Sequence, residues 1–341
     1  VINATLATID NPEITLDDLM ASIPGPDFPT GAMMLGQGGA RLAYATGRGS
    51  IMMRSTYVIE EGRGDRQSIV LTAIPFQVGK SGLVEKIAEA ARDKRIEGVA
   101  DIRDESNREG VRVVIELKRD ATAEVVLNQL WRHTPAQSSF PANMLAIRGG
   151  RPEMMGLKTI LEAFIAFREE VITRRCKFEL AKARDRAHIL LGLVVAVSNL
   201  DEVVRIIRGS SSPAAARDAL LAREWPIGDI APYIRLVEAI DGEMDDSSSY
   251  RLSEIQVKAI LDLRLHRLTA LGRDDIGNEL KELASEIEEL LSILADREKL
   301  YVVMREELVA VRDEFAKPRR TQLAPAADGI DDEDLIEREE M

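Results

Sequence analysis

Residues of the types that carry enzymatic chemistry are sparse in this chain and far apart. Its three histidines, His133, His188 and His266, fall in separate segments, and Cys176 is its single cysteine. A zinc site needs several Cys or His ligands at short spacings, and a disulfide framework needs paired cysteines. The sequence therefore predicts no metal site, no disulfide scaffold and no catalytic constellation within this chain.

Three other segments match functional motifs only in part. Gly36-Gln37-Gly38-Gly39 is not followed by Gly-Lys-Ser/Thr, and Gly79-Lys80-Ser81 has no glycine five residues before Gly79. Because a P-loop requires both halves of its motif, we read the first as a turn and the second as a helix cap. The acidic run Asp331-Asp332-Glu333-Asp334 has no flanking strand, so it predicts a solvated linker and not a magnesium site.

The charge of the chain is unevenly distributed. Its 341 residues carry a net charge of −13, but residues 1–200 hold 26 Lys+Arg and 25 Asp+Glu, whereas residues 201–341 hold 19 and 33. A polyanion would therefore meet the N-terminal part. The length suggests two or three domains. No run of 18 apolar residues and no signal peptide is present, so we expect no membrane and a cytoplasmic protein. Because the chain starts inside an expected helix, Val1–Ile9, and ends after an acidic run, we expect an internal fragment.

An apolar heptad pattern near the C-terminus is the strongest structural signal. Its steps alternate between four and three residues, with one polar interruption at Arg297. A seam of about 40 residues is typical of a coiled coil. The seam consists of Ile276, Leu280, Leu283, Ile287, Leu290, Leu294, Arg297, Tyr301, Met304, Leu308, Val311 and Phe315.

The expected partner of this helix lies in the same chain. The segment from Leu157 to about Asn199 is equally long, contains no proline, and has Gly192 as its only glycine. At 1.5 Å per residue, each helix would span about 60–65 Å. Two such helices joined by a compact insertion of short helices, residues 201–272, predict a rigid arm with a knob at its tip.

The segment before the arm predicts a mixed α/β domain. Strands, helix caps and turns alternate there as strand, strand, helix, and the order is given twice, which suggests two ββα units on one sheet. The expected elements are strands Ser50–Glu60 and Gln67–Ile74, a helix capped by Ser81 and running to about Arg95, a second unit from Val99, a strand Gly110–Lys118, and a helix capped by Asp120 and ending near Trp131.

Two residue groups are candidate binding sites. Basic side chains near turns and helix starts are suited to phosphate contacts; these are Arg41, Arg48, Arg54, Arg148, Arg151 and Lys158. The segment Ser253–Leu271 is apolar on most of its faces, so it packs in the core of the knob or meets a second copy of the chain, and we favour the interface. The predicted interface residues are Ile255, Ile260, Leu261, Leu265, Leu268 and Leu271.

Several strings resemble one family over nearly the whole chain and in the same order. They are IPGPDFPTG (Ile23–Gly31), YATGRG (Tyr44–Gly49), VADIRDES (Val99–Ser106), the Phe164–Arg175 segment, KARDRAHIL (Lys182–Leu190), AILDLRLHRLTAL (Ala259–Leu271) and REELVAVRDEF (Arg305–Phe315). This set resembles the A subunits of bacterial DNA gyrase, which are type IIA topoisomerases.

The resemblance implies a multidomain α+β fold: a mixed α/β tower domain, a long antiparallel coiled-coil arm, and a small all-α dimerisation gate at its tip. The implied boundaries are a DNA-flanking tower at 1–150, an ascending helix at 151–200, an exit gate at 201–272, a descending helix at 273–317, and an acidic linker at 318–341 toward a C-terminal DNA-wrapping domain.

The resemblance also implies an activity for the parent protein. The family breaks, passes and rejoins duplex DNA, and gyrase uses ATP to introduce negative supercoils. Its partners would be duplex DNA, a second copy of the chain and the B subunit of gyrase, in an A2B2 heterotetramer associated with the chromosome. No cofactor is expected in this chain, because Mg²⁺ and ATP would act through the B subunit.

The family's nucleophile is a tyrosine in an Arg-Tyr-Thr context, which none of the five tyrosines here has: Tyr44, Tyr57, Tyr233, Tyr250 and Tyr301. We therefore expect this fragment to be inactive by itself. Two alternatives stay open: the A subunit of topoisomerase IV, which decatenates DNA, and a non-enzymatic coiled-coil protein that organises chromosomes.

Overall fold

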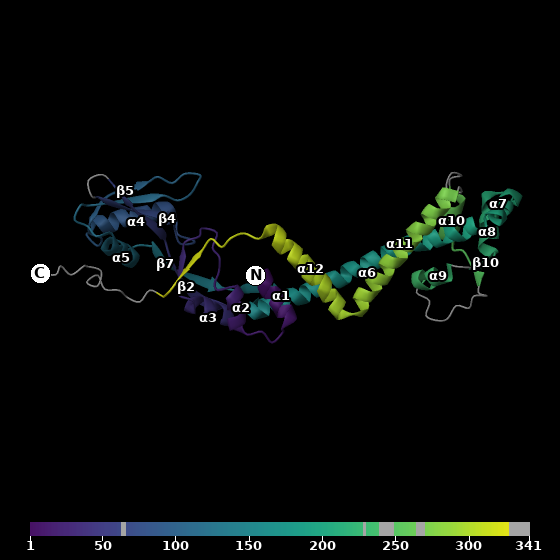
Figure 1. The fold of residues 1–341 in the computed structure, drawn as a ribbon, viewed down its shortest axis with the longest axis horizontal. Helices are drawn as coiled ribbons and strands as arrows, with labels where there is room; N and C mark the ends of the chain where they lie inside the picture. Colours follow the sequence, from purple (N-terminus) through teal and green to yellow (C-terminus); the bar gives the residue numbers. More distant parts are fainter. Residues whose placement is uncertain (63–65, 228–229, 239–248, 264–269, 327–341) are drawn as a thin grey trace. The chain divides into compact units, whose positions relative to one another are not determined.

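The computed structural model describes residues 1–62, 66–227, 230–238, 249–263 and 270–326. It is a mixed α+β structure, as predicted, with several small sheets and one long helix, α6 (Leu157–Ser198). The chain divides into two compact units, which are described separately. Unit 1 comprises Val1–Ala166 and Leu308–Met341, and unit 2 comprises Phe167–Glu307 (Figure 1).

The larger sheet of unit 1 confirms the repeated strand-strand-helix order. Its four antiparallel strands lie in the order β3-β4-β6-β5, and a core of aliphatic side chains joins the sheet to two helices. The elements are β3 (Thr56–Glu61), β4 (Gln67–Ala73), α4 (Lys80–Arg92), β5 (Val99–Asp104), β6 (Val113–Leu117) and α5 (Ala123–His133). The predicted helix caps were wrong, because α4 is preceded by Gly79 and α5 by Thr122.

A second sheet, in the order β12-β1-β2-β7, corrects the expected strand Ser50–Glu60. That segment breaks at Ser55, so β2 (Arg48–Arg54) belongs to the second sheet and β3 to the first. Ser55 is fully buried, and its backbone N–H donates to the Ala136 carbonyl at 2.8 Å. The remaining strands are β1 (Met33–Leu35), β7 (Gln137–Asn143) and β12 (Gln322–Ala324), and the three helices of this region are α1 (Ile2–Asp10), α2 (Leu16–Ser22) and α3 (Gly38–Thr46).

Strand β12 also corrects the expectation of a linker starting at residue 318. It pairs in parallel with β1, with Gln322 opposite Met33. The buried hydroxyl of Thr321 accepts a hydrogen bond from the Phe28 N–H at 2.8 Å, and the Asp27 carboxylate accepts from the N–H groups of Arg320 and Thr321. Residues 318–326 are thus fixed to the Pro-rich loop, while the predicted acidic run lies outside the described residues.

Unit 2 consists mainly of helices. Beyond α6 they are α7 (Leu200–Gly209), α8 (Pro213–Ala222), α9 (Ala231–Glu238), α10 (Glu254–Leu261), α11 (Ala270–Ala295) and α12 (Arg297–Phe315). The short strands β10 (Trp225–Pro226) and β11 (Ser249–Tyr250) pair with each other, so this region is not purely helical. In the part of the chain that the structure describes, no helix is both long and apolar enough to span a bilayer.

The expected single return helix is two helices, because Asp296 starts a new one. Its carboxylate accepts a hydrogen bond from the Glu298 N–H at 2.9 Å, as the residue before a helix commonly does. The heptad seam is buried at Ile287 and Met304, but Val311 and Phe315 near its end are 48% and 63% exposed. The predicted apolar seam is therefore wrong at its C-terminal end.

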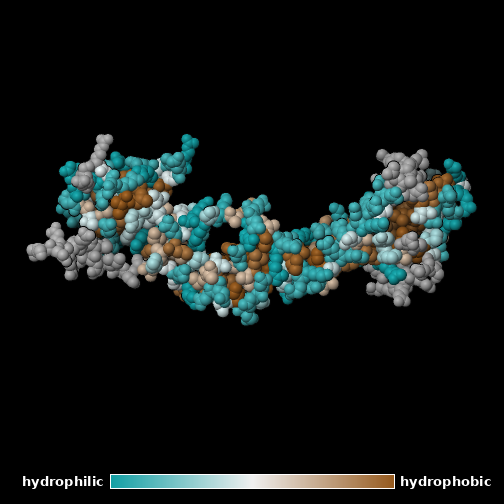
Figure 2. Space-filling model, in the orientation of Figure 1, coloured by the Kyte–Doolittle hydropathy of each residue, from teal (hydrophilic) through white to brown (hydrophobic). Residues whose placement is uncertain are grey.

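Helix α6 runs antiparallel to α11 and α12 within unit 2. Glu169 pairs with Arg297, and farther along α6 Arg186 pairs with Glu279 at 2.7 Å. Partner numbers thus fall as α6 numbers rise. The side chains facing this pair from α6, among them Ile172 and Ala187, are buried. Hydrophilic side chains cover most of the face seen in Figure 2, with hydrophobic ones exposed in patches over both units.

Candidate nucleic-acid and dimer interfaces

All six predicted DNA-contact residues lie in unit 1, but only some are free to bind a ligand. Arg48 begins β2 and Arg151 begins β9 (Arg151–Met154), and neither makes an ion pair within the described residues. Lys158 lies in the first turn of α6, 3.9 Å from Glu162. Exposed pairs of this kind contribute little, so its ammonium stays available to an anion.

Two glycines bring the start of β2 against the start of α6. Gly47 has a left-handed φ of 82°, and a Cβ there would lie 2.7 Å from Met154 Cγ. A Cβ on Gly156, just before α6, would lie 2.6 Å from the Tyr44 carbonyl oxygen. Only glycine permits both approaches. The YATGRG string is thus the segment that places Arg48 beside the elements carrying Arg151 and Lys158.

The hairpin of β8 (Leu145–Arg148) and β9 presents two arginines on one face of its ribbon. Arg148 and Arg151 are register partners across the Gly149-Gly150 turn. Arg148 lies 4.0 Å from Glu153, at the limit of an ion pair. The two guanidinium groups thus form a concentrated positive charge at an exposed tip.

Arg41 and Arg54 are already engaged. Arg41 pairs with Asp17 through both guanidinium nitrogens, and this hydrogen bonding lowers the pKa of Asp17. Arg54 donates to Gln137 Oε1 at 2.9 and 2.6 Å and lies 5.0 Å from the centre of the Trp131 ring. Burial lowers the pKa of Arg54, so its position is better explained by structure than by phosphate contact.

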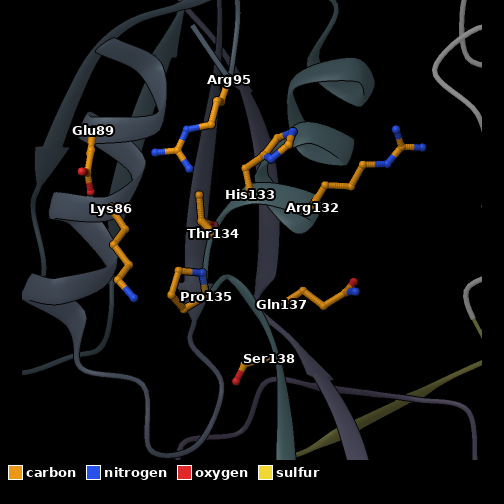
Figure 3. A pocket seen from close by; sticks show the side chains of 9 residues that line it. All are labelled: Lys86, Glu89, Arg95, Arg132, His133, Thr134, Pro135, Gln137 and Ser138. Carbon is orange, nitrogen blue, oxygen red and sulfur yellow. The ribbon is translucent and has the colours of Figure 1, made fainter. Parts of the chain in front are cut away.

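A basic hollow of unit 1 was missed by the sequence reasoning. It has a volume of about 490 Å³ and is shown in Figure 3. Its basic residues come from α4, the loop after it and the end of α5, and they surround Thr134 and Pro135. They are Lys86, Arg95, Arg132 and His133, with Glu89 as the acidic member. Arg95 pairs with Asp93 at 2.9 Å. The basic pair at the end of α5 was the available sequence signal.

The predicted dimer-interface residues divide into three groups. Ile255 is 61% exposed, whereas Ile260 is 5% exposed and belongs to the local core, so the prediction of a shared interface face is wrong for Ile260. Leu261 is partly buried. Leu265 and Leu268 lie outside the described residues. Leu271 falls in α11, but its side chain is outside the described set.

A buried polar network fixes α10 against α6. His188 Nδ1 lies 2.6 Å from Glu238 Oε1, and its Nε2 lies 2.7 Å from Ser253 Oγ. The fully buried Gln256 donates to the His188 carbonyl at 2.7 Å. A Cβ on Gly192 would lie 2.5 Å from Gln256 Cβ, which explains the single glycine of α6. Sequence reasoning noticed this glycine but could not identify its neighbour.

The arrangement offers little for bond-making chemistry. Among the described residues, no group of three or more His, Cys, Asp or Glu side chains is placed to hold a metal ion. Burial raises the pKa of Tyr44 to about 12, and burial also raises the pKa of Tyr250. A tyrosine of raised pKa is a weaker nucleophile at neutral pH. The described geometry is suited to contacting other molecules.

Comparison with known proteins agrees with this organisation. Residues 1–309 match the family model for the A subunit of DNA gyrase/topoisomerase IV. The chain is 54% identical to the DNA gyrase A subunit of Granulibacter bethesdensis, 50% to that of Rickettsia felis and 45% to that of Haemophilus influenzae, in each case over its full length. It spans 36%, 38% and 39% of these relatives. This chain belongs to the family of DNA gyrase/topoisomerase IV A subunits.

Proposed function

We propose that this chain is the part of a gyrase A subunit that guides DNA during strand passage while another part of the protein cleaves it. The observation that carries the proposal is the antiparallel pairing of α6 with α11 and α12, which is held by ion pairs and continues into a cluster of short helices. Such a helix pair is stiff, so it can keep two binding regions apart while one of them opens.

Unit 1 would be the tower domain that flanks the cleaved duplex. The residues that we assign to the DNA backbone are Arg48 and Arg151, which have no ion pair among the described residues, the hairpin arginine Arg148, and Lys158. Phosphate contacts need exposed cations, and these four supply them. Arg41 and Arg54 are withdrawn from this assignment because other side chains of unit 1 engage them.

The short helices of unit 2 would form the exit gate, where two A subunits meet and separate. The exposed Ile255 supports this assignment, and Leu261, Leu265, Leu268 and Leu271 would complete the apolar contact. Residues 201–341 carry 33 acidic and 19 basic residues, so a passing DNA segment would be repelled there and would not be retained.

The remaining assignments concern the whole assembly. Two A subunits and two B subunits would act together on DNA in the cytoplasm, in association with the chromosome. ATP and Mg²⁺ would bind through the B subunit, and the nucleophilic tyrosine would lie in a part of the A subunit other than this one. The raised pKa values of Tyr44 and Tyr250 support that placement.

The test is supercoiling by the full A subunit reconstituted with its B subunit. We expect ATP-dependent negative supercoiling of a relaxed plasmid, and loss of this activity when Leu265 and Leu268 are both changed to Glu. Sedimentation equilibrium of the variant should show weaker association of A subunits. Supercoiling by a variant that is strictly monomeric would refute the gate assignment.

The family description also covers topoisomerase IV, so a second assay is needed. The three curated relatives quoted above are named as gyrase A subunits, which favours supercoiling over decatenation. Decatenation of linked circles without any supercoiling would identify the topoisomerase IV alternative.

A further inference from the structure

Unit 2 contains a cavity of about 610 Å³ beside the His188 network. It lies along α6 and is closed by the end of α9 and the start of α10. Its size falls in the range of small-molecule sites. The lining residues are Lys177, Leu180, Ala181, Arg184, Asp185, His188, Val237, Glu238 and Ile255.

One polar atom of this lining is left without a partner. The Nε of Arg184 is buried and has no hydrogen-bond acceptor, and its guanidinium makes no ion pair within the described ranges. Buried donors are almost always satisfied, so an orphaned N–H at the wall of a cavity indicates a missing acceptor. Because guanidinium groups bind carboxylates well, that acceptor is best supplied by an oxyanion.

The other charges of the cavity limit the charge of this oxyanion. Lys177 lies two helical turns before Arg184 and has no ion pair among the residues with described side chains, so the open part holds two cations. Asp185 opposes them. Glu238 is a fourth charged group, but its Oε1 already interacts with His188 Nδ1 at 2.6 Å and with the Tyr250 hydroxyl at 3.1 Å. The surplus of one cation favours a monoanion over a dianion.

The rest of the wall is apolar. Leu180 and Val237 line the cavity, and Ile255 is 61% exposed at its edge although it is a large aliphatic residue. An aliphatic body placed against these side chains would remove their surface from water. The ligand that fits both halves of the lining is therefore an organic monocarboxylate with an apolar chain.

We propose that this cavity is a binding site for such amphiphilic monocarboxylates, with the carboxylate on Arg184 and Lys177 and the apolar chain toward Ile255. The bound molecule would join α6 to α9 and α10. The site is distinct from the residues assigned to DNA and does not depend on strand-passage activity.

The test is isothermal titration of the full-length A subunit with octanoate. We expect one molecule per subunit, with octanol and octyl phosphate binding more weakly because the first lacks the charge and the second carries too much. Arg184→Lys keeps the cation but removes the Nε–H, so affinity should fall about tenfold, as for the loss of a hydrogen bond to a charged group. Ala181→Trp should fill the cavity and abolish binding.

Arg174→Lys is the matched control, since Arg174 is exposed on the same helix and pairs only with Glu170 within the described residues. It should bind octanoate as the unchanged protein does. Circular dichroism of each variant checks that it folds. Absence of octanoate binding to the unchanged protein, or equal binding by folded Arg184→Lys, would overturn the proposal.

Discussion

Glu169 of α6 accepts two hydrogen bonds from the guanidinium of Arg297, from Nε and Nη2, both at 2.9 Å. Arg297 is the residue that interrupts the apolar heptad seam. Its side chain is 68% exposed, and it also lies 5.1 Å from the centre of the Tyr301 ring. The interruption is therefore a specific polar contact at the first residue of α12, where the return helix restarts.

Glu169→Gln should weaken this contact by a small amount. The pair is largely exposed, so we expect the free energy of unfolding to fall by about 0.5–1 kcal/mol, and less at high salt. Urea denaturation at low and high salt measures both. Glu170→Gln is the control, because Glu170 pairs only with Arg174 at 3.6 Å within the described residues. An equal loss in both variants would contradict a role for the Arg297 fork.

The same contact predicts a dependence on pH. The hydrogen bonds from Arg297 lower the pKa of Glu169 below its ordinary value. A carboxylate whose pKa is lowered by folding stabilises the protein above its unfolded pKa, and this contribution is lost as the pH falls through the folded value. Stability should thus decline less steeply below about pH 5 in Glu169→Gln than in the unchanged protein. Parallel pH profiles would contradict this assignment.

Gly192→Ala should destabilise unit 2. The new Cβ would lie 2.5 Å from Gln256 Cβ, so α10 must shift, at a cost of about 1–3 kcal/mol. The matched control is Gly277→Ala in α11, where nothing lies within 4 Å of the added Cβ. Alanine favours a helix by about 1 kcal/mol, so this control should be neutral or stabilising. Thermal unfolding compares the two, and a Gly192→Ala protein as stable as the control would show that α10 moves freely.

The sequence predicted the elements whose cause is local. Helix α6 and most of the apolar seam follow from periodicity, and the alternation of Val113 and Ile115 located β6. The change of sheet at Ser55 was not predictable, because strand propensity continues through this residue and the change depends on contact with Ala136. Strand β12 depends on pairing with Met33, which lies in a distant part of the sequence, and no local pattern records that pairing.

The candidate sites show the same division. Exposure of Arg48 and Arg151 follows from turns that the sequence marks with glycine. The capture of Arg54 by Trp131 and Gln137 required three separate elements to meet, so residue type alone predicted a DNA contact there. The hollow around Lys86 and Arg95 was likewise missed because its residues are distant in sequence.

Asp27→Asn should loosen the segment containing β12. Burial raises the pKa of Asp27, but hydrogen bonds from the N–H groups of Thr321 and Arg320 outweigh it and lower the pKa overall. The carboxylate therefore stabilises this contact above its unfolded pKa and stops doing so as the pH falls through the lowered value. Hydrogen exchange should show faster exchange of the Thr321 and Gln322 amides at neutral pH. Unchanged exchange would show that pairing with β1 holds β12 alone.

Arg48 and Arg151 should contribute to DNA affinity through phosphate contacts. Replacing both with Ala in the full A subunit should weaken duplex binding similarly across sequences and reduce the slope of log K against log salt by about 1 for each lost contact. Fluorescence anisotropy over a series of salt concentrations measures the slope. Arg174→Ala, a change at an exposed arginine of unit 2, should leave both quantities unaltered. Arg54→Ala should lower thermal stability more than it lowers affinity, since Trp131 loses its stacked partner. Equal slopes for the double variant and the unchanged protein would place the DNA on another surface of unit 1.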